Sequence, residues 1–159
     1  MVKDVREGLP RLPVVGEAKR GPEGHLTYLL RQANASVRLA LDRALAKEEM
    51  THPQQSVLTM IRAYKAISAA DVARLTMLTP QTINGIVRAL EMRGAIRKVP
   101  DPVHGRILRL IITDEGRALN KRCRALTAPI EATLQAKMGA NAEEATRQWL
   151  VEVAKAFLD

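Results

Sequence analysis

The chain has 159 residues, enough for one domain with elaborations and for a buried core that needs no disulfide bonds. Apolar residues make up 47% of the sequence and aromatic residues only 3%, which favours helices and argues against an aromatic-rich β-sandwich. The formal net charge of +8 indicates an anionic partner, nucleic acid first and an anionic membrane surface second. A basic surface without such a partner is the alternative.

Cysteine content and hydropathy favour a cytoplasmic protein. Cys123 is the single cysteine, so no disulfide can form within the chain, as expected in a reducing compartment. The first residues contain no apolar stretch of signal-peptide length, and no segment reaches the ~18 apolar residues of a membrane span. We therefore expect a soluble intracellular protein with no membrane partner.

The N-terminal part is predicted as an irregular arm followed by a long helix. Residues 1–22 are rich in proline, glycine and charge, which predicts an arm that could pack across a dimer partner. From residue 23 to 48, apolar residues recur at steps of three and four, which predicts a helix with a broad apolar face. These residues are Leu26, Leu30, Ala33, Val37, Ala40 and Ala44.

Two shorter helices follow. Thr51 and Gln54 have the spacing of a capping box, so a helix begins at Thr51. Ser68 is the predicted N-cap of a short helix over 69–76. The residues expected to face inward are Val57, Leu58, Ile61 and Tyr64 of the first helix and Val72 and Leu75 of the second.

A third helix combines a buried stripe with a polar outer face. Thr79 is its predicted N-cap, Pro80 its first residue, and Gly94 the residue that ends it after Arg93. The buried stripe is Ile83, Ile86, Val87 and Leu90. The residues left exposed are Thr79, Pro80, Gln81, Thr82, Asn84, Gly85 and Arg88.

Beyond this helix the pattern predicts a hairpin and two further helices. Two β-like runs, 95–99 and 107–112, are separated by a loop that contains two prolines and a glycine. Thr113 caps a helix from residue 114 to about 137, which Pro129 should kink. Gly139 ends this helix, and Asn141 caps the last one. The apolar face of the last helix is Ala145, Trp149, Val153 and Ala156.

Three helices followed by a hairpin predict a winged helix-turn-helix. In this fold the third helix enters the major groove by its N-terminal end, so that end must be small and polar. Gln81 and Asn84 carry amides that can pair with adenine edges, and Arg88 can bind guanine or a phosphate. An ordinary polar surface helix is the alternative.

The basic charge is concentrated in the same region. Residues 51–113 hold nine Lys/Arg against three Asp/Glu, so most of the net charge lies in well under half of the chain. The nine cations are Arg62, Lys65, Arg74, Arg88, Arg93, Arg97, Lys98, Arg106 and Arg109. Contacts with DNA phosphates need a basic surface of this kind.

One stretch resembles the wing signature of the MarR family of transcriptional regulators. It comprises Asp101 and Pro102, then Gly105 and Arg106, then the run from Ile112 to Gly116. The paired helices over 68–94 also resemble the family, and the resemblance spans about residues 25–157. It implies a mainly α fold, with a winged-helix lobe (residues 51–113) that carries a two-stranded antiparallel wing. Helices over 23–48 and 114–158 then form a homodimer within a single domain over 23–159.

The resemblance also implies DNA contacts. Arg106 takes the place of the arginine that enters the minor groove, which is favoured where that groove is narrow. Thr82, Asn84 and Arg88 take base- or phosphate-facing places. Two positions depart from the family, because His104 stands where an aspartate usually steadies the wing arginine and Gly85 where a basic residue is common. The candidate DNA-binding residues are Ser68, Thr79, Pro80, Gln81, Thr82, Asn84, Gly85, Arg88, His104 and Arg106.

The family resemblance further implies a small-molecule effector. In MarR proteins, small anionic aromatic compounds bind between the DNA-binding lobe and the dimer helices. Arg31, Arg38 and His52 lie on helices that would border such a crevice and could bind an anion. The alternative is that these three residues are solvated or form pairs between subunits.

Other chemistries find little support in the sequence. His25, His52 and His104 are too scattered for a metal site, and we expect no cofactor. Cys123 is expected to be a buried structural thiol rather than a peroxide sensor. No nucleophile elbow, phosphate-binding glycine loop or catalytic acid–base pair is present, so we expect no enzyme. The function expected is a repressor that binds a pseudo-palindromic operator; a winged-helix protein-interaction module is the rival.

Overall fold

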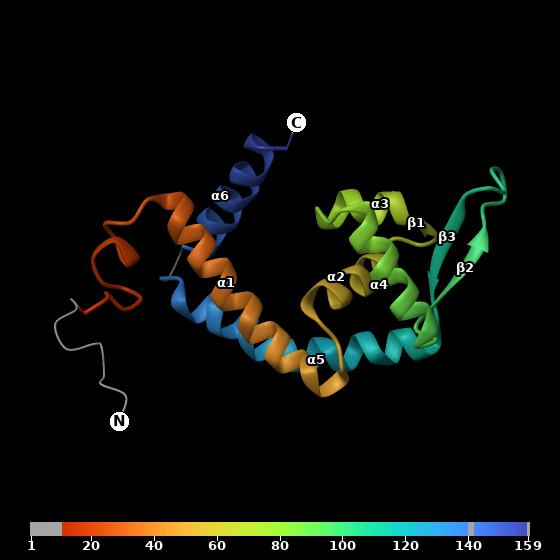
Figure 1. The fold of residues 1–159 in the computed structure, drawn as a ribbon, viewed down its shortest axis with the longest axis horizontal. Helices are drawn as coiled ribbons and strands as arrows, with labels where there is room; N and C mark the ends of the chain where they lie inside the picture. Colours follow the sequence, from red (N-terminus) through yellow and green to blue (C-terminus); the bar gives the residue numbers. More distant parts are fainter. Residues whose placement is uncertain (1–10, 140–141, 159) are drawn as a thin grey trace, which may run out of the picture. The chain divides into compact units, whose positions relative to one another are not determined.

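The computed structural model describes residues 11–139 and 142–158, and it is mainly helical with one small antiparallel sheet (Figure 1). The chain divides into two compact units at Leu39 and Ala40, and each is described by itself below. Among the described residues, no helix is both long enough and apolar enough to span a bilayer.

The first unit is an arm folded against a helix. A 3₁₀ turn, η1 (Ala18–Arg20), precedes helix α1 (Leu26–Leu45), which runs on into the second unit. The Arg20 guanidinium donates to the Gln32 amide oxygen at 3.2 Å and to the Pro13 carbonyl at 3.0 Å, and the Gln32 amide donates back to the Arg20 carbonyl. The predicted helix over 23–48 is confirmed with shorter bounds, because η2 (Ala46–Glu48) tightens its end.

The second unit contains the three predicted helices α2 (His52–Ala63), α3 (Ala69–Thr76) and α4 (Pro80–Met92). Their N-caps are confirmed: the side chains of Thr51, Ser68 and Thr79 each accept a hydrogen bond from the backbone N–H three residues on. Each bond satisfies a backbone donor that has no partner within the helix. Gly94 follows α4 with a φ of +69°, in the left-handed region that favours glycine.

Two residues predicted to face inward are half exposed. Tyr64 is 51% exposed because α2 ends at Ala63, and its φ and ψ of −110° and 102° turn its side chain off the helical face. Leu75 is 45% exposed because α3 buries Val72 and Ala73 instead. Leu75 lies about 110° around the helix from the midpoint of Val72 and Ala73, at the edge of the face that these two residues bury.

The sheet has three strands, one more than predicted. The wing hairpin consists of β2 (Ile96–Pro100) paired with β3 (Leu108–Ile112). Each end of these strands lies within one residue of the predicted bounds. A third strand, β1 (Ile67–Ser68), pairs with the other edge of β3, with Ile67 opposite Leu110. A strand of two residues is too short to show a periodicity, so the sequence did not reveal it.

The core lies between these helices and the sheet, with α2 at its centre in contact with α3, α4, α5 and β3. All four residues of the predicted α4 stripe are buried. The largest fully buried apolar side chains are Leu45, Leu58, Ile61, Ile83, Leu90 and Leu110.

Helix α5 (Asp114–Lys137) begins where the wing ends. Thr113 caps it by accepting from the Gly116 N–H at 3.0 Å, and the Thr113 hydroxyl donates to the Gly94 carbonyl at 2.6 Å. A Cβ on Gly116 would lie 1.9 Å from the Ala95 carbonyl oxygen, so only glycine allows this close approach. The threonine and glycine of the wing signature thus join the start of α5 to the start of β2.

Helix α6 (Glu143–Ala156) completes the chain, and the predicted cap Asn141 lies outside the described residues. Pro129 lies within α5 without ending it. Arg147 of α6 pairs with Glu143 at 2.7 Å and with Glu131 of α5 at 3.6 Å. No described residue of α6 is buried.

Candidate nucleic-acid interface

The N-terminal end of α4 presents polar side chains to solvent. Gln81, Asn84 and Arg88 are exposed, whereas Ile83, Ile86 and Val87 between them are buried. The Thr82 hydroxyl lies 2.8 Å from that of Thr79, so Thr82 takes part in the helix cap. Gly85 has no atom within 4 Å of the position a Cβ would take, which leaves this face open. The arrangement suits a helix that enters a groove by its first turns.

Asp101 anchors the loop of the wing. Its carboxylate accepts from the backbone N–H groups of His104 at 2.7 Å and Val103 at 2.8 Å, and from the Arg109 Nε at 2.5 Å. The hydrogen bond from His104, then those from Arg109 and Val103, lower the pKa of Asp101 from 3.8 to about 2. Because the folded pKa is lowered, the anchor is fully present above pH 3.8 and is lost as the pH falls through about 2.

Arg106 and His104 lie at the exposed tip of this loop. Arg106 makes no hydrogen bond or ion pair with any residue that the structure describes, so its guanidinium is available to a ligand. Asp101 holds the backbone of Val103 and His104, and in the part of the chain that the structure describes neither a hydrogen bond nor an ion pair joins it to Arg106. The wing signature contained Asp101, but its role as the anchor of the loop was not predicted.

Arg109 of β3 joins the wing to α3. Besides its bond to Asp101, its Nη1 lies 4.0 Å from a carboxylate oxygen of Asp71. Asp71 accepts from the Ser68 hydroxyl and pairs with Arg74, and these two hydrogen bonds lower the pKa of Asp71. Ser68 is therefore engaged in the cap of α3, and its predicted contact with DNA stays a prediction.

The basic surface is smaller than the sequence suggests. Four of the nine cations in the lobe bind the protein itself: Arg74 with Asp71, Arg93 with the Glu49 carbonyl, Lys98 with Glu91, and Arg109 with Asp101. Five have no such partner among the described residues, namely Arg62, Lys65, Arg88, Arg97 and Arg106. Those in α4 and the wing are Arg88, Arg97 and Arg106.

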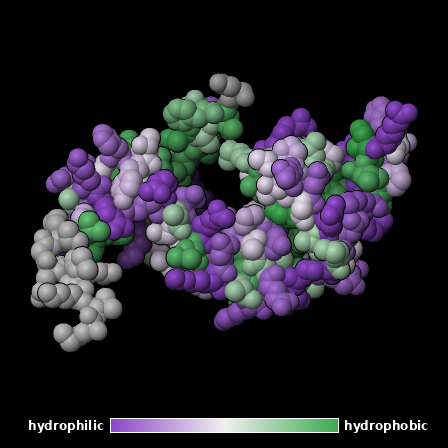
Figure 2. Space-filling model, viewed as in Figure 1, coloured by the Kyte–Doolittle hydropathy of each residue, from purple (hydrophilic) through white to green (hydrophobic). Residues whose placement is uncertain are grey.

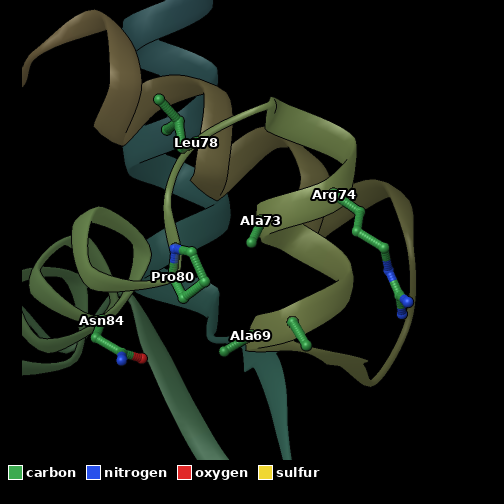
Figure 3. A pocket seen from close by; sticks show the side chains of 7 residues that line it. Ala69, Ala73, Arg74, Leu78, Pro80 and Asn84 are labelled. Atoms are coloured by element: carbon green, nitrogen blue, oxygen red, sulfur yellow. The ribbon is translucent and has the colours of Figure 1, made fainter. Parts of the chain in front are cut away.

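A cleft of about 500 Å³ lies between α3 and the start of α4. Figure 3 shows Pro80 and Asn84 on the α4 side and Ala69, Ala73 and Arg74 on the α3 side. The lining is mainly apolar, and Asn84 supplies a side-chain amide. The cleft therefore borders one of the predicted base-reading residues.

The three predicted ligand-binding residues lie in different units. In the first unit, the Arg31 guanidinium lies 5.5 Å from the centre of the Tyr28 ring, and Arg38 is exposed on α1. In the second, His52 donates its backbone N–H to Asp42 at 2.7 Å, and its ring lies 3.4 Å from the Ser56 hydroxyl. A shared effector site for Arg31, Arg38 and His52 stays a prediction.

Cys123 is fully buried, and burial raises the pKa of its thiol. A raised pKa leaves less of the reactive thiolate, which favours a structural role over a redox one. Within residues 11–139 and 142–158, no three His, Cys, Asp or Glu side chains are grouped so that they could hold a metal ion.

Comparisons with known proteins agree on one family. The family model described as MarR matches residues 50–108, from two residues before α2 to the first residue of β3. The HTH-type transcriptional repressor Rv2887 of Mycobacterium tuberculosis is 34% identical over 115 residues, which cover 72% of this chain and 83% of that protein. Its solved complex with salicylic acid has a TM-score of 0.66 at 30% identity and covers 83% of this chain and 98% of that one.

A second solved structure is a DNA complex. The transcriptional repressor CouR bound to a 23-mer DNA duplex has a TM-score of 0.76 and 27% identity. The match covers 82% of this chain and 92% of that one.

Proposed function

Because this chain belongs to the MarR family of DNA-binding transcriptional regulators, we propose that it is a cytoplasmic repressor that binds a pseudo-palindromic operator as a homodimer. A small anionic ligand, such as an aromatic acid, releases it from the operator. The observation that carries the proposal is the exposed polar start of α4 beside a wing whose Arg106 has no partner among the described residues. The relatives are regulators, and we propose no catalytic activity for this chain.

In this proposal α4 and the wing bind neighbouring grooves. The first turns of α4 lie in the major groove, where Gln81 and Asn84 can each pair with an adenine edge. Arg88, one turn further on, binds a guanine or a phosphate. The wing places Arg106 in the adjacent minor groove.

The apolar surface of α6 supports the homodimer. Its exposed large apolar residues are Trp149, Leu150 and Val151, followed by Phe157 and Leu158 beyond the helix. Figure 2 shows apolar residues gathered over this helix. A monomer rarely exposes a contiguous apolar patch of this kind unless the patch binds a partner. A two-fold dimer would also place two copies of α4 one turn of DNA apart, about 34–36 Å.

The effector is proposed from the relatives and from the cations on α1 and α2. Rv2887 has been solved with salicylic acid. Arg31 and Arg38 supply positive charge and His52 supplies an imidazole on the helices where the sequence predicts an anion site. The cleft beside Asn84 is a second place where a small apolar ligand would interfere with base reading. A ligand at either place would release the operator because it binds the free protein more tightly than the operator-bound protein.

Replacing Arg106 with alanine should weaken operator binding by about 1–3 kcal/mol, because one groove contact is lost. The fold should survive, since the side chain is exposed and bonds to no described residue. The measurement is a fluorescence-anisotropy titration at fixed salt. Arg11→Ala removes the same charge from the arm and serves as the control. An Arg106→Ala protein with wild-type affinity would refute the wing contact.

Replacing Asn84 with alanine should relax sequence preference more than it lowers binding to random DNA. The reason is that base contacts specify the sequence and phosphate contacts position the protein. The measurement compares operator with a random duplex of equal length. Arg97→Gln, which removes an exposed cation of β2, should instead weaken both complexes alike. Equal losses on both duplexes for Asn84→Ala would mean that Asn84 does not read bases.

A further inference from the structure

A second cleft, of about 440 Å³, lies between α2 and α5. Five of its six lining residues carry a charged or amide group at the end of the side chain: Arg62, Arg117, Asn120, Lys121 and Arg124, with Ala125 as the sixth. Arg62 comes from the last turn of α2, and the other five residues come from the first half of α5. Neither the DNA-reading helix nor the wing contributes a lining residue.

Two buried polar contacts set the register of the helices that form this cleft. The Asn120 amide donates to the Thr59 hydroxyl at 3.0 Å, and the Gln55 amide donates to the Thr127 hydroxyl at 3.2 Å. Asn120 is only 1% exposed. Because Thr59 pairs with Asn120 and Gln55 with Thr127, the helices run antiparallel. This register brings the end of α2, with Arg62, beside the start of α5.

The cations of α5 form a stripe along the cleft. Arg117, Lys121 and Arg124 are spaced by four and three residues, so they share one face of the helix. Like charges at this spacing weaken a helix. Arg117 is compensated by Asp114, whose carboxylate lies 2.7 Å from its Nη2. Arg62, Lys121 and Arg124 have no partner among the described residues, so three positive charges line the cleft without compensation.

The cleft is separate from the DNA-reading surface. Helix α2 contacts α3 and α4 on the one hand and α5 on the other (Figure 1). The residues that line this cleft belong to α2 and α5 alone, and none belongs to α3, α4 or the wing hairpin. The cations in this cleft are therefore a different set from Arg88, Arg97 and Arg106 of α4 and the wing.

We propose that this cleft binds the pyrophosphate group of a small molecule. The stripe from Arg117 to Arg124 spans about 10 Å along the helix, at ~1.5 Å per residue. Two linked phosphates carry more negative charge than one, so they balance the three uncompensated cations more closely than a single phosphate does. Guanidinium groups bind phosphate oxygens through paired hydrogen bonds, and lysine adds a point charge. A concave site lined by one sign of charge also concentrates anions.

The test is calorimetric titration of the full chain with inorganic pyrophosphate, ADP and orthophosphate at constant ionic strength near 0.15 M, where exposed charges are screened beyond about 8 Å. We expect pyrophosphate to bind at least about tenfold more tightly than orthophosphate, because each lost charge-assisted contact weakens binding by about tenfold. ADP that binds like pyrophosphate identifies a nucleotide as the source of the group. Pyrophosphate binding without ADP binding identifies the free anion.

The variant Lys121→Gln/Arg124→Gln should lower pyrophosphate affinity about tenfold or more. Its control, Arg43→Gln/Lys137→Gln, removes the same two charge types from exposed positions outside the cleft and should leave affinity within about twofold. Circular dichroism melts verify that both variants fold.

Three results would overturn the proposal. Orthophosphate that binds as tightly as pyrophosphate would show a single-phosphate site or bulk charge attraction. Equal losses in the two double variants would show that net charge alone matters. A Lys121→Gln/Arg124→Gln protein that keeps pyrophosphate affinity but loses DNA affinity would assign the cleft to DNA. The pyrophosphate result does not depend on the proposed operator, because no DNA is present in the titration.

Discussion

Replacing Gly116 with alanine should lower the free energy of unfolding by about 3 kcal/mol, the upper range for an overpacked site. The added Cβ would lie 1.9 Å from the Ala95 carbonyl oxygen and 2.9 Å from a side-chain carbon of Ile112. Ile112 is the last residue of β3 and Ala95 directly precedes β2, so the start of α5 must move away from the sheet. That movement would also stretch the Thr113 hydroxyl bond to Gly94, 2.6 Å long in the native protein.

The same substitution at Gly85 is the matched control. Gly85 lies within α4, and nothing lies within 4 Å of where its Cβ would be. Alanine favours a helix over glycine by about 1 kcal/mol, so Gly85→Ala should stabilise the protein. Urea unfolding followed by circular dichroism measures both variants. A Gly116→Ala protein as stable as the wild type would refute the close approach between the start of α5 and the Ala95 carbonyl.

Replacing Trp149 with aspartate should abolish dimerisation and lower operator affinity by at least about 100-fold, because two linked lobes bind far more tightly than one. Trp149 is 43% exposed on α6, which buries none of its described residues. A charge placed in an apolar interface must be desolvated without a partner, which is strongly unfavourable. Light scattering at low micromolar concentration measures the mass, and DNA titration measures the affinity.

Gln148→Asp provides the control for this charge. Gln148 is the neighbour of Trp149 in α6 and is exposed. We expect the Gln148→Asp protein to have the mass of a dimer and the operator affinity of the wild type. A wild-type protein that is monomeric yet binds the operator at full affinity would contradict the dimer. Aggregation of the Trp149→Asp protein would still indicate that the patch is normally covered.

The parts that local chemistry determines could be predicted from the sequence. Thr51, Ser68 and Thr79 each cap a helix through a bond that spans three residues, so the sequence contains all of the information. The stripe of α4 follows the helical repeat, and all four of its residues are buried. The wing signature was recognisable because its threonine and glycine meet a local packing requirement.

Contacts between distant residues could not be predicted in this way. Arg109 was counted as a free cation, but its partners Asp71 and Asp101 are brought to it by the sheet. The cleft between α2 and α5 depends on a register set by residues 61 and 72 positions apart. Tyr64 was assigned to the core because the periodicity does not reveal that α2 ends one residue earlier.

The two ion pairs of Arg109 bear on how the protein would adapt to an operator with a different spacing between its halves. A single side chain pairs with Asp101 below the wing tip and with Asp71 at the start of α3, so these two ion pairs link the hairpin to α3. If the wing and α4 bind DNA as proposed, this link restricts changes in the offset between the minor-groove and major-groove contacts of one lobe. In the proposed dimer, altered spacing between the operator halves would then be accommodated where the two lobes are joined. Selection for new spacing should therefore change residues of α1, α5 or α6 before those of α4 or the wing.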